Sequence, residues 1–443
     1  MRPARGNPRL VYCRNRSTQQ KYMPAAHIVV HYHELWLKGG NRDFFLSKMR
    51  LALKRALEGL RVARITEPGD RYLIDLADAA QLPEALERLQ RVFGIANFSV
   101  ARAVEWKGEG APNQKLATLQ EAAWEETRGE TFTTFAVRAR RSDKRFPMNA
   151  MKIEREVGGY LHDQLLAAGR PARVDLRNPE LTCRIEVTPG PVLLYARRIP
   201  GAGGLPTGTA GRLTCLLSGG FDSAVAAFKM MRRGANVHFV HFWGGGARPG
   251  ESSAHVAREL VKRLAVWQHA AKLYLVPFEA AQREVVHAAP ERLRILLYRR
   301  LMLRIAGRIA RHERSNGIVT GDSLGQVASQ TLQNMAAVGA ASRLPIYRPL
   351  VGDDKLEILA LARKIGTHDI SAEPFHDCCP VFQPKAPALF ASVEELDAAE
   401  SLLDLAEMEG RALKTMTVER YRYEQGKVTG VAPTRKTTAQ TEK

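Results

Sequence analysis

Cysteine and long apolar runs are both scarce in this chain of 443 residues. Only five cysteines occur, and no two are spaced as Cys-x-x-Cys, which argues against a disulfide framework and a structural zinc site. No uninterrupted apolar stretch approaches the roughly 20 residues that span a membrane. The first residues lack the apolar core of a secretory signal. These absences predict a protein of the reducing cytoplasm with no membrane partner.

Acidic residues are too few to balance the basic ones. There are 46 aspartates and glutamates against 66 lysines and arginines, a formal charge of +20. An excess of this size favours a polyanionic partner, because neutralising phosphates releases counterions. A large RNA is the favoured partner, and a merely solvated basic surface is the alternative. The length allows roughly two to four domains with sizeable cores.

The common phosphate-binding signatures are also absent. No Gly-x-Gly-x-x-Gly opens a helix, and no Walker A lysine follows a glycine-rich loop. Instead, an apolar run from Leu213 ends in Ser218-Gly-Gly-Phe-Asp-Ser223, and an alanine-rich amphipathic segment follows. The pattern predicts a buried strand, a glycine turn and a helix that opens near Asp222 or Ser223. Glycines let a ligand approach the backbone and helix N–H groups favour an anion, so we interpret the loop as a phosphate cradle.

The part of the chain before this loop shows two α/β patterns. Residues 1–23 are polar and aperiodic, which predicts a disordered extension, with Met23 as an alternative start. A strand at 28–32 and a helix capped by Asn41 begin the first pattern. The second pattern contains a basic strand and loop that suit phosphate binding without sequence reading; a solvated charged face is the alternative. Its candidate RNA-binding residues are Arg138, Arg140, Arg141, Lys144 and Arg145.

Strands and helices alternate regularly after a glycine-rich linker at 201–211. Beyond the loop, strands are predicted near 237–242, 273–276 and 318–320, with helices between them. A right-handed, doubly wound parallel sheet is the simplest arrangement of that order. Ligands bind beyond the carboxyl ends of such strands, where the Ser218 loop, His241-Phe242 and Thr320-Gly321-Asp322-Ser323 fall.

Three stretches carry a family resemblance. Ser218–Ser223 resembles the PP-loop of ATP pyrophosphatases, which cleave ATP between its α- and β-phosphates. Residues 137–144 and 154–159 resemble a THUMP domain, which grips the acceptor end of tRNA, and 33–42 resembles the ferredoxin-like domain that precedes it. Over about residues 24–387 the chain is therefore similar to the tRNA 4-thiouridine synthetase family.

This resemblance implies an α/β fold, in which N-terminal ferredoxin-like and THUMP domains precede a doubly wound parallel-sheet PP-loop ATP pyrophosphatase domain. The expected limits are 1–23 for the disordered extension, 24–80 for the ferredoxin-like domain, 81–199 for the THUMP domain, 200–395 for the adenylation and sulfur-transfer domain and 396–443 for a C-terminal helix and polar tail.

The resemblance also implies a reaction. ATP adenylates the C4 oxygen of a tRNA uridine, at position 8 in the family, and pyrophosphate leaves; persulfide sulfur then displaces AMP and gives 4-thiouridine. Ser218, Gly219, Gly220 and Ser223 would cradle the pyrophosphate. Asp222 would orient Mg²⁺, which prefers oxygen ligands and bridges phosphates, and no protein metal site is otherwise predicted.

Further site residues follow from matching the family's positions. Lys355 matches a catalytic lysine that stabilises charge at the α-phosphate. The nucleotide is also held at the positions of Leu216, Leu217, His241, Phe242, Arg299, Gly321 and Gln330.

Two adjacent cysteines in a proline-rich loop, Cys378 and Cys379, are the candidate sulfur carriers. Loops expose thiols, and nearby basic groups favour the reactive thiolate. Cys379 best matches the family's catalytic cysteine, and Cys378 is the alternative. Cys183 and Cys215 lie in apolar strands and are expected to be buried and inert.

The expected partners are tRNA and a cysteine desulfurase or other persulfide donor. Longer family members carry a C-terminal rhodanese domain, for which the residues after Pro387 are too few. A separate rhodanese is therefore a further candidate partner, a role in thiamine biosynthesis is doubtful, and a homodimer is left open. The alternatives are another THUMP/PP-loop tRNA-modifying ligase, which transfers nitrogen and needs no cysteine, and a tRNA-binding protein with an inactive nucleotide site.

Overall fold

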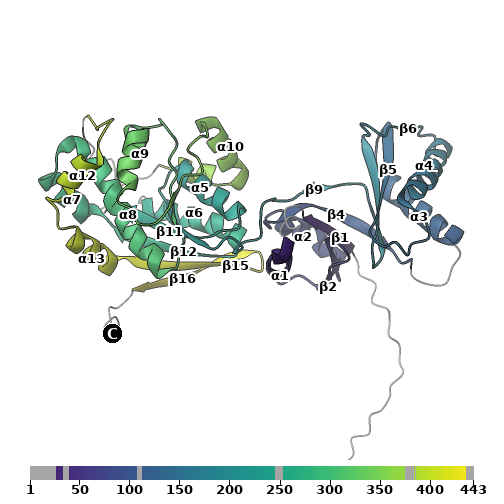
Figure 1. Cartoon of the computed structure of the whole chain (residues 1–443). Coiled ribbons are helices and arrows are strands. Elements are labelled where there is room, and N and C mark those ends of the chain that lie inside the picture. Colours follow the sequence, from purple (N-terminus) through teal and green to yellow (C-terminus); the bar gives the residue numbers. More distant parts are fainter. Residues whose placement is uncertain are drawn as a thin grey trace, which may run out of the picture.

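The computed structural model describes residues 26–32, 39–106, 112–244, 253–374, 384 and 386–435. These residues form three units, and Figure 1 shows the N-terminal unit between the other two. The predicted extension at 1–23 and the pair Cys378-Cys379 lie outside the described residues. Among the helices that are described, none has the length and apolar character needed to cross a bilayer.

The first unit is a four-stranded antiparallel sheet with two helices. Strand β1 lies in its middle and pairs with β3 and β4, and Met49 and Leu53 of α1 are buried against the sheet. Asn41 stands before α1 as predicted, but its side chain makes no capping hydrogen bond. The elements are β1 (Ala26–Tyr32), α1 (Arg42–Ala56), β2 (Val62–Thr66), β3 (Arg71–Leu76), α2 (Leu82–Leu89) and β4 (Ile95–Val104).

This first core extends past residue 80, where we expected a domain boundary. Ala85 and Leu89 of α2 and Ile95 and Phe98 of β4 are buried in the same cluster as β1 and β3. The small antiparallel sheet needs α2 and β4 to complete its apolar face, so the boundary falls after the first half of β4.

The second unit continues the same sheet through the long strand β4. Residues Arg102–Val104 of β4 pair with β8, which gives the order β2-β3-β1-β4-β8-β7-β5-β6, with β9 also on β4. Helices α3 and α4 pack together and against this part of the sheet. The elements are α3 (Pro112–Thr127), β5 (Thr134–Arg141), α4 (Ala150–Ala167), β6 (Arg173–Val174), β7 (Leu181–Val187), β8 (Val192–Tyr195) and β9 (Ile199–Pro200).

The third unit confirms the predicted doubly wound sheet. Five parallel strands run in the order β14-β13-β10-β11-β12, so the chain winds outward from β10 first on one side and then on the other. The strands are β10 (Arg212–Leu216), β11 (Asn236–Trp243), β12 (Ala270–Pro277), β13 (Ile318–Val319) and β14 (Ile346–Tyr347). The helices are α5 (Phe221–Arg232), α6 (Ser253–Gln268), α7 (Glu279–Ala288), α8 (Arg294–His312), α9 (Leu332–Gly339), α10 (Lys355–Ile365), α11 (His368–Ala372), α12 (Val393–Glu400) and α13 (Leu405–Thr415).

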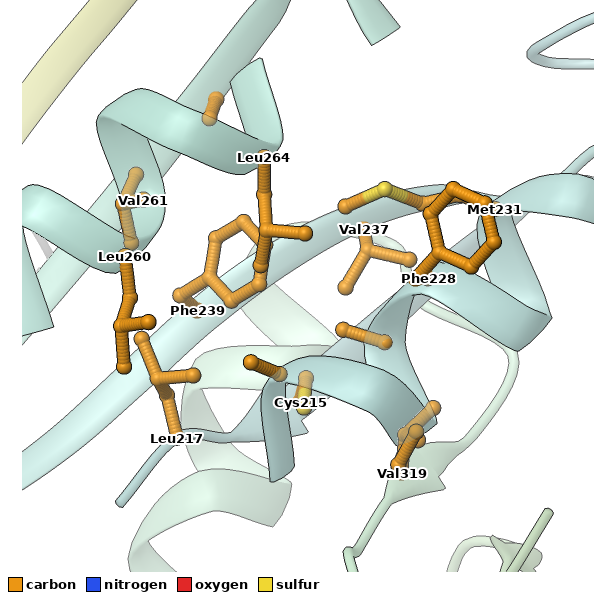
Figure 2. Close-up of a cluster of buried hydrophobic side chains, with 14 of the residues drawn as sticks. Cys215, Leu217, Phe228, Met231, Val237, Phe239, Leu260, Val261, Leu264 and Val319 are labelled. Atoms are coloured by element: carbon orange, nitrogen blue, oxygen red, sulfur yellow. The ribbon is translucent and has the colours of Figure 1, made fainter. Parts of the chain in front are cut away.

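Both faces of this sheet are buried, as the continuous apolar run of β11 predicts. Figure 2 shows one face, where Val237 and Phe239 of β11 meet Leu260 and Leu264 of α6. On the other face, Val240 and Phe242 pack in a cluster with residues of α7, α8 and α13. Side chains alternate along a strand, so one run of apolar residues serves both layers.

The predicted polar tail is wrong for residues 417–435, which form the antiparallel strands β15 (Thr417–Glu424) and β16 (Lys427–Arg435). Strand β15 pairs with β12 and extends the sheet of the third unit. Val418, Tyr421 and Tyr423 are buried, and Gln425 and Gly426 both have positive φ, as a tight hairpin turn requires. The apolar–polar alternation and the Gln-Gly pair were the available sequence signals.

The first and third units are packed together through an aromatic contact. Phe93, which follows α2, stacks on Trp267 of α6 at 5.4 Å between ring centroids and lies 5.5 Å from Phe228 of α5. The linker is equally close: a Cβ on Gly204 would lie 2.0 Å from the Arg232 carbonyl oxygen. Only glycine fits there, so the glycine-rich linker is a tight joint between units.

Candidate active site

The candidate active site lies at the carboxyl edge of the parallel sheet, where β10 is flanked by β11 and β13. The chain winds in opposite directions from β10, and open α/β sheets bind ligands at such a switch point. A pocket of about 230 Å³ occupies this position. Predicted site residues that line it are Leu216, Leu217, Ser218, Asp222, Ser223, His241, Phe242, Arg299, Gly321 and Gln330.

The loop between β10 and α5 is held by its two serines. The Ser218 amide donates to Ser223 Oγ at 3.0 Å, the two hydroxyl oxygens lie 3.1 Å apart, and the Gly220 amide donates to Ser218 Oγ at 3.3 Å. Helix α5 begins at Phe221, one residue before the predicted start, and Gly220 provides no side-chain cap. The N–H groups of the first turn of α5 are therefore available to an anion.

Gly321 explains how the end of β13 meets this loop. A Cβ at position 321 would lie 2.6 Å from the Ser223 nitrogen and 2.8 Å from the Asp222 carbonyl carbon. A larger residue would push the two strand ends apart, so glycine is required for close approach. Gly219 and Gly220 shape the loop itself and are not among the lining residues of the pocket.

His241 supports the pocket wall through both of its ring nitrogens. Nδ1 lies 2.8 Å from the Leu217 carbonyl oxygen, and Nε2 lies 3.0 Å from Ser253 Oγ. A carbonyl only accepts, so Nδ1 carries the proton that is donated to Leu217. The imidazole thus fixes the carboxyl end of β10, which was not foreseen in the sequence.

A buried carboxylate organises the cations of the pocket. Asp322 accepts hydrogen bonds from the guanidinium of Arg299, from Arg348 Nε at 3.2 Å and from Thr320 Oγ1 at 2.8 Å. Burial alone would raise the pKa of Asp322, but the adjacent arginines and the hydroxyl hold that pKa below its usual value. Arg299 also donates to Ser329 Oγ at 2.9 Å. Asp322 therefore fixes two guanidinium groups at the pocket wall.

Asp222 and Lys355 meet at the mouth of the pocket. Lys355 Nζ lies 2.7 Å from Asp222 Oδ1, and Gln326 Nε2 donates to Asp222 Oδ2 at 3.2 Å. Lys355 is the first residue of α10, whose N-cap Asp354 forms a capping box with Glu357. The structure thus brings together two predicted catalytic residues that are 133 positions apart.

Arg348 and Gln326 were missed as site residues by sequence reasoning. Asp322 was placed at a strand end where ligands bind, but no role was predicted for it. Arg348 follows β14, a strand of two residues that is too short to recognise by pattern. Only the pairing of β14 with β13 brings its guanidinium to the pocket.

The described cysteines behave as predicted. Cys183 and Cys215 are fully buried free thiols that form no disulfide. Burial raises the pKa of Cys183 to about 12. Burial also raises the pKa of Cys215 well above its usual value. Neither thiol is reactive at neutral pH. In the part of the chain that the structure describes, no group of three or more His, Cys, Asp and Glu side chains could hold a metal.

The five basic residues predicted to bind RNA do not form one uniform surface. Arg138 and Arg140 are exposed on β5; the former donates to the Leu176 carbonyl and the latter lies 3.4 Å from Asp70. Lys144 and Arg145 are exposed on the following loop, where Arg145 pairs with Asp143. Arg141 instead donates to the carbonyls of Phe146 at 3.3 Å and Met148 at 3.1 Å, which gives it a structural role in that loop.

Comparisons with known proteins agree with this architecture. The model of the ThiI ferredoxin-like domain matches residues 27–99, that of the THUMP domain matches 115–197, and that of the thiamine biosynthesis protein (ThiI) matches 208–405. A probable tRNA sulfurtransferase of Thermus thermophilus is 43% identical, covering 88% of this chain and 92% of its own length. The probable tRNA sulfurtransferase of Moorella thermoacetica is 37% identical, covering 88% and 96%.

A solved structure supports the same relationship. The crystal structure of a 4-thiouridine synthetase–RNA complex with bound ATP matches with a TM-score of 0.78 and 31% identity, covering 89% of this chain and 99% of that one. The order of the three units, the switch-point pocket and the extent of these matches lead to one conclusion: the chain belongs to the tRNA sulfurtransferase family.

Proposed function

We propose that this chain is an ATP-dependent tRNA sulfurtransferase that converts a uridine, at position 8 of tRNA, into 4-thiouridine. The observation that carries the proposal is the pocket at the switch point, where an uncapped helix N-terminus, two anchored arginines and Lys355 meet. These are the groups that a nucleoside triphosphate needs. The relatives that match this chain over most of its length are named probable tRNA sulfurtransferases.

The pocket residues fit ATP by their chemistry. The amides and hydroxyls of Ser218–Ser223 would bind the pyrophosphate, and Arg299 would add positive charge. Leu216, Leu217 and Phe242 offer an apolar slot to adenine. Gln330 also lines the pocket, and its buried Oε1 has no hydrogen-bond partner among the described residues, so it is available to a donor on the nucleotide.

Lys355 and Asp222 would act on the phosphates in different ways, Lys355 directly and Asp222 through a metal ion. Mg²⁺ bound with ATP would neutralise the leaving pyrophosphate, and Asp222 is its proposed protein ligand. With Asp222 engaged by the metal, Lys355 would be free to direct its ammonium group toward the α-phosphate and stabilise the charge that develops there. The uridine O4 attacks the α-phosphorus, the bond to the bridging oxygen breaks, and pyrophosphate leaves.

The sulfur step is assigned to Cys379, with Cys378 as its partner; both lie outside the described residues. The terminal sulfur of a Cys379 persulfide attacks C4, and AMP leaves with the former O4 oxygen. The Cys378 thiolate then attacks Cys379, which releases 4-thiouridine and leaves a disulfide for an external thiol to reduce. A cysteine desulfurase or another persulfide donor, with or without a separate rhodanese, would reload the carrier.

The tRNA would be gripped mainly by the first two units, of which the second presents Arg138, Arg140 and Lys144. We propose that the ferredoxin-like and THUMP domains bind the RNA and that the PP-loop domain from about residue 200 performs the chemistry. A cytoplasmic location and a homodimer remain predictions.

The test is thiolation of a tRNA transcript with ATP and a persulfide donor, read by mass spectrometry of nucleosides. We expect 4-thiouridine from the wild-type transcript and none from a transcript with cytidine at position 8. Cys379→Ser should still release AMP and pyrophosphate with tRNA but form no 4-thiouridine, and Cys378→Ser should be equally severe if the disulfide forms. Normal thiolation by both serine variants would overturn the sulfur assignment.

A further inference from the structure

A second cavity, of about 390 Å³, lies on the catalytic unit between α8, the turn before β14, and α13. Its walls carry the arginines Arg304, Arg308, Arg311 and Arg343. Leu303 lines both this cavity and the active-site pocket, so the two are neighbours along α8. None of these arginines has a role in the adenylation site or in the basic strand β5.

The four arginines differ in how they are held. Arg304 is committed to Glu400, with a 2.6 Å contact to Oε2, and Arg308 has a looser contact of 3.5 Å with Glu409, which also lines the cavity. Arg311 and Arg343 are exposed, and across the described ranges neither has a carboxylate partner. Among the described residues that line the cavity, the guanidinium groups of Arg308, Arg311 and Arg343 are thus balanced by one carboxylate, that of Glu409.

Such an arrangement is unfavourable without an anion. Arg308 and Arg311 are three residues apart on α8, so their like charges repel each other on one helix face. Arg343 adds a third positive charge from another element. By contrast, Arg300 and Arg304 share the buried carboxylate of Glu400. The planar guanidinium fork matches the oxygens of a phosphate.

The open floor of the cavity also suits a phosphate. Gly307 lies between Arg304 and Arg308 on α8, and a Cβ at its position would meet nothing within 4 Å. Glycine inside a helix costs about 1 kcal/mol relative to alanine, so its presence here leaves room at the expense of helix stability.

We propose that the cavity of Arg308, Arg311 and Arg343 binds phosphates of the sugar–phosphate backbone of the RNA substrate. The inference rests on the proposed function and extends it to a second RNA contact on the catalytic unit. Arg308 and Arg311 follow Arg299 by nine and twelve residues, which at 1.5 Å per residue places them roughly 14–18 Å along α8 from the active-site arginine. The end of α8 leads into the start of β13, so this contact would hold the RNA backbone toward the amino edge of the sheet, away from the pocket, and would not read the sequence.

The first experiment measures the salt dependence of tRNA binding for Arg311→Ala/Arg343→Ala. We expect affinity to fall several-fold at low salt, and the slope of log K against log salt to decrease by roughly 1.4–1.8 for two lost phosphate contacts. The matched control is Lys262→Ala/Arg283→Ala, which removes the same charge from two side chains paired with glutamates of their own helices. Equal slopes for the two double variants would overturn the proposal.

A second variant fills the cavity without weakening the helix. Gly307→Glu replaces glycine with a better helix former and adds a negative charge to the cavity, so we expect thermal stability at or above that of the wild type and weaker tRNA binding. ATP hydrolysis without tRNA should stay at the wild-type rate in all variants. Wild-type RNA affinity in Gly307→Glu would contradict the proposal.

Inorganic phosphate distinguishes the two sources of the anion. Phosphate at about 10 mM should raise the thermal unfolding midpoint of a protein that binds it. If it does so for the wild type but not for Arg311→Ala/Arg343→Ala, and both proteins bind tRNA equally, then the cavity binds free phosphate and the RNA assignment is wrong. These measurements do not use thiolation. If no 4-thiouridine forms, but the salt slopes of Arg311→Ala/Arg343→Ala and of its control still differ, then the proposed function is wrong and the RNA contact stands.

Discussion

The active-site pocket and the basic strand β5 both present arginines, yet they hold them in different ways. In the pocket, Arg299 and Arg348 are fixed by the buried carboxylate of Asp322. On β5, Arg138 and Arg140 are exposed, and Arg140 is only 3.4 Å from an exposed aspartate. A fixed cation stabilises charge at one point, whereas a loosely held cation can follow a flexible polyanion. The pocket should therefore respond to geometry and the strand to salt.

The largest expected effect tests the pocket alone. Asp222→Ala removes the partner of Lys355 and the proposed magnesium ligand, so pyrophosphate release should fall by about 100-fold or more. Affinity for tRNA should stay within a few-fold, because β5 lies in another unit. Pyrophosphate release and filter binding measure the two quantities. Near wild-type release would exclude the assigned role of this loop.

A smaller loss is expected when the arginines stay but their anchor is weakened. Asp322→Asn keeps both arginines in the chain but removes the negative charge that positions Arg299 and Arg348. A catalytic group that is displaced by about 1 Å can lower the rate by up to roughly 100-fold. We expect kcat to fall more than KM for ATP rises, with tRNA affinity unchanged. Ser329→Ala, which removes one hydrogen bond to Arg299, is the milder control. Equal rates for Asp322→Asn and wild type would show that the anchoring is irrelevant to catalysis.

On the strand side, the comparison predicts a change in salt dependence. Arg138→Ala/Arg140→Ala should weaken tRNA binding about tenfold at low salt and reduce the salt slope by roughly 1.4–1.8. ATP hydrolysis without tRNA should not change. Arg141→Ala is the contrast, because its guanidinium donates to two loop carbonyls, so it should lower stability more than the slope. An unaltered slope in the double variant would identify β5 as a solvated face.

The smallest effect at neutral pH concerns the junction between the first and second units. Glu186 is buried and accepts from His31 at 3.0 Å and Tyr195 at 3.0 Å, and it lies 2.8 Å from Arg71. Burial would raise the pKa of Glu186, but these partners lower it to about 2. This stabilisation, on the order of 2–3 kcal/mol, is present above the unfolded pKa of about 4.5 and is lost as pH falls toward 2.

Urea unfolding of this region at pH 7, 5 and 3 measures that contribution. The loss of stability between pH 5 and 3 should be smaller in Glu186→Gln, which has no carboxylate to protonate. The control is Glu130→Gln, whose exposed pair with Arg197 should be worth less than about 1 kcal/mol. Identical acid sensitivity in wild type and Glu186→Gln would show that another group titrates.

The strands and helices around the loop were predictable because their patterns are local. The apolar run into Ser218 and the continuous apolar run of Val237–Phe242 depend only on neighbouring residues. The C-terminal hairpin was missed although Arg420 and Arg422 alternate with apolar residues, because this short alternation lies in a segment that is otherwise polar. Its apolar side chains become favourable only when β15 pairs with β12.

By itself, the sequence determined the glycine loop, the alternation that makes a parallel sheet and the excess of positive charge, since each is a property of neighbouring residues or of composition. Only the tertiary structure decided that Lys355 reaches Asp222, that Arg348 joins Arg299 on Asp322, and that Arg141 serves its own loop. These contacts join residues whose spacing along the chain carries no signal, because strand order and helix packing set the distance between them.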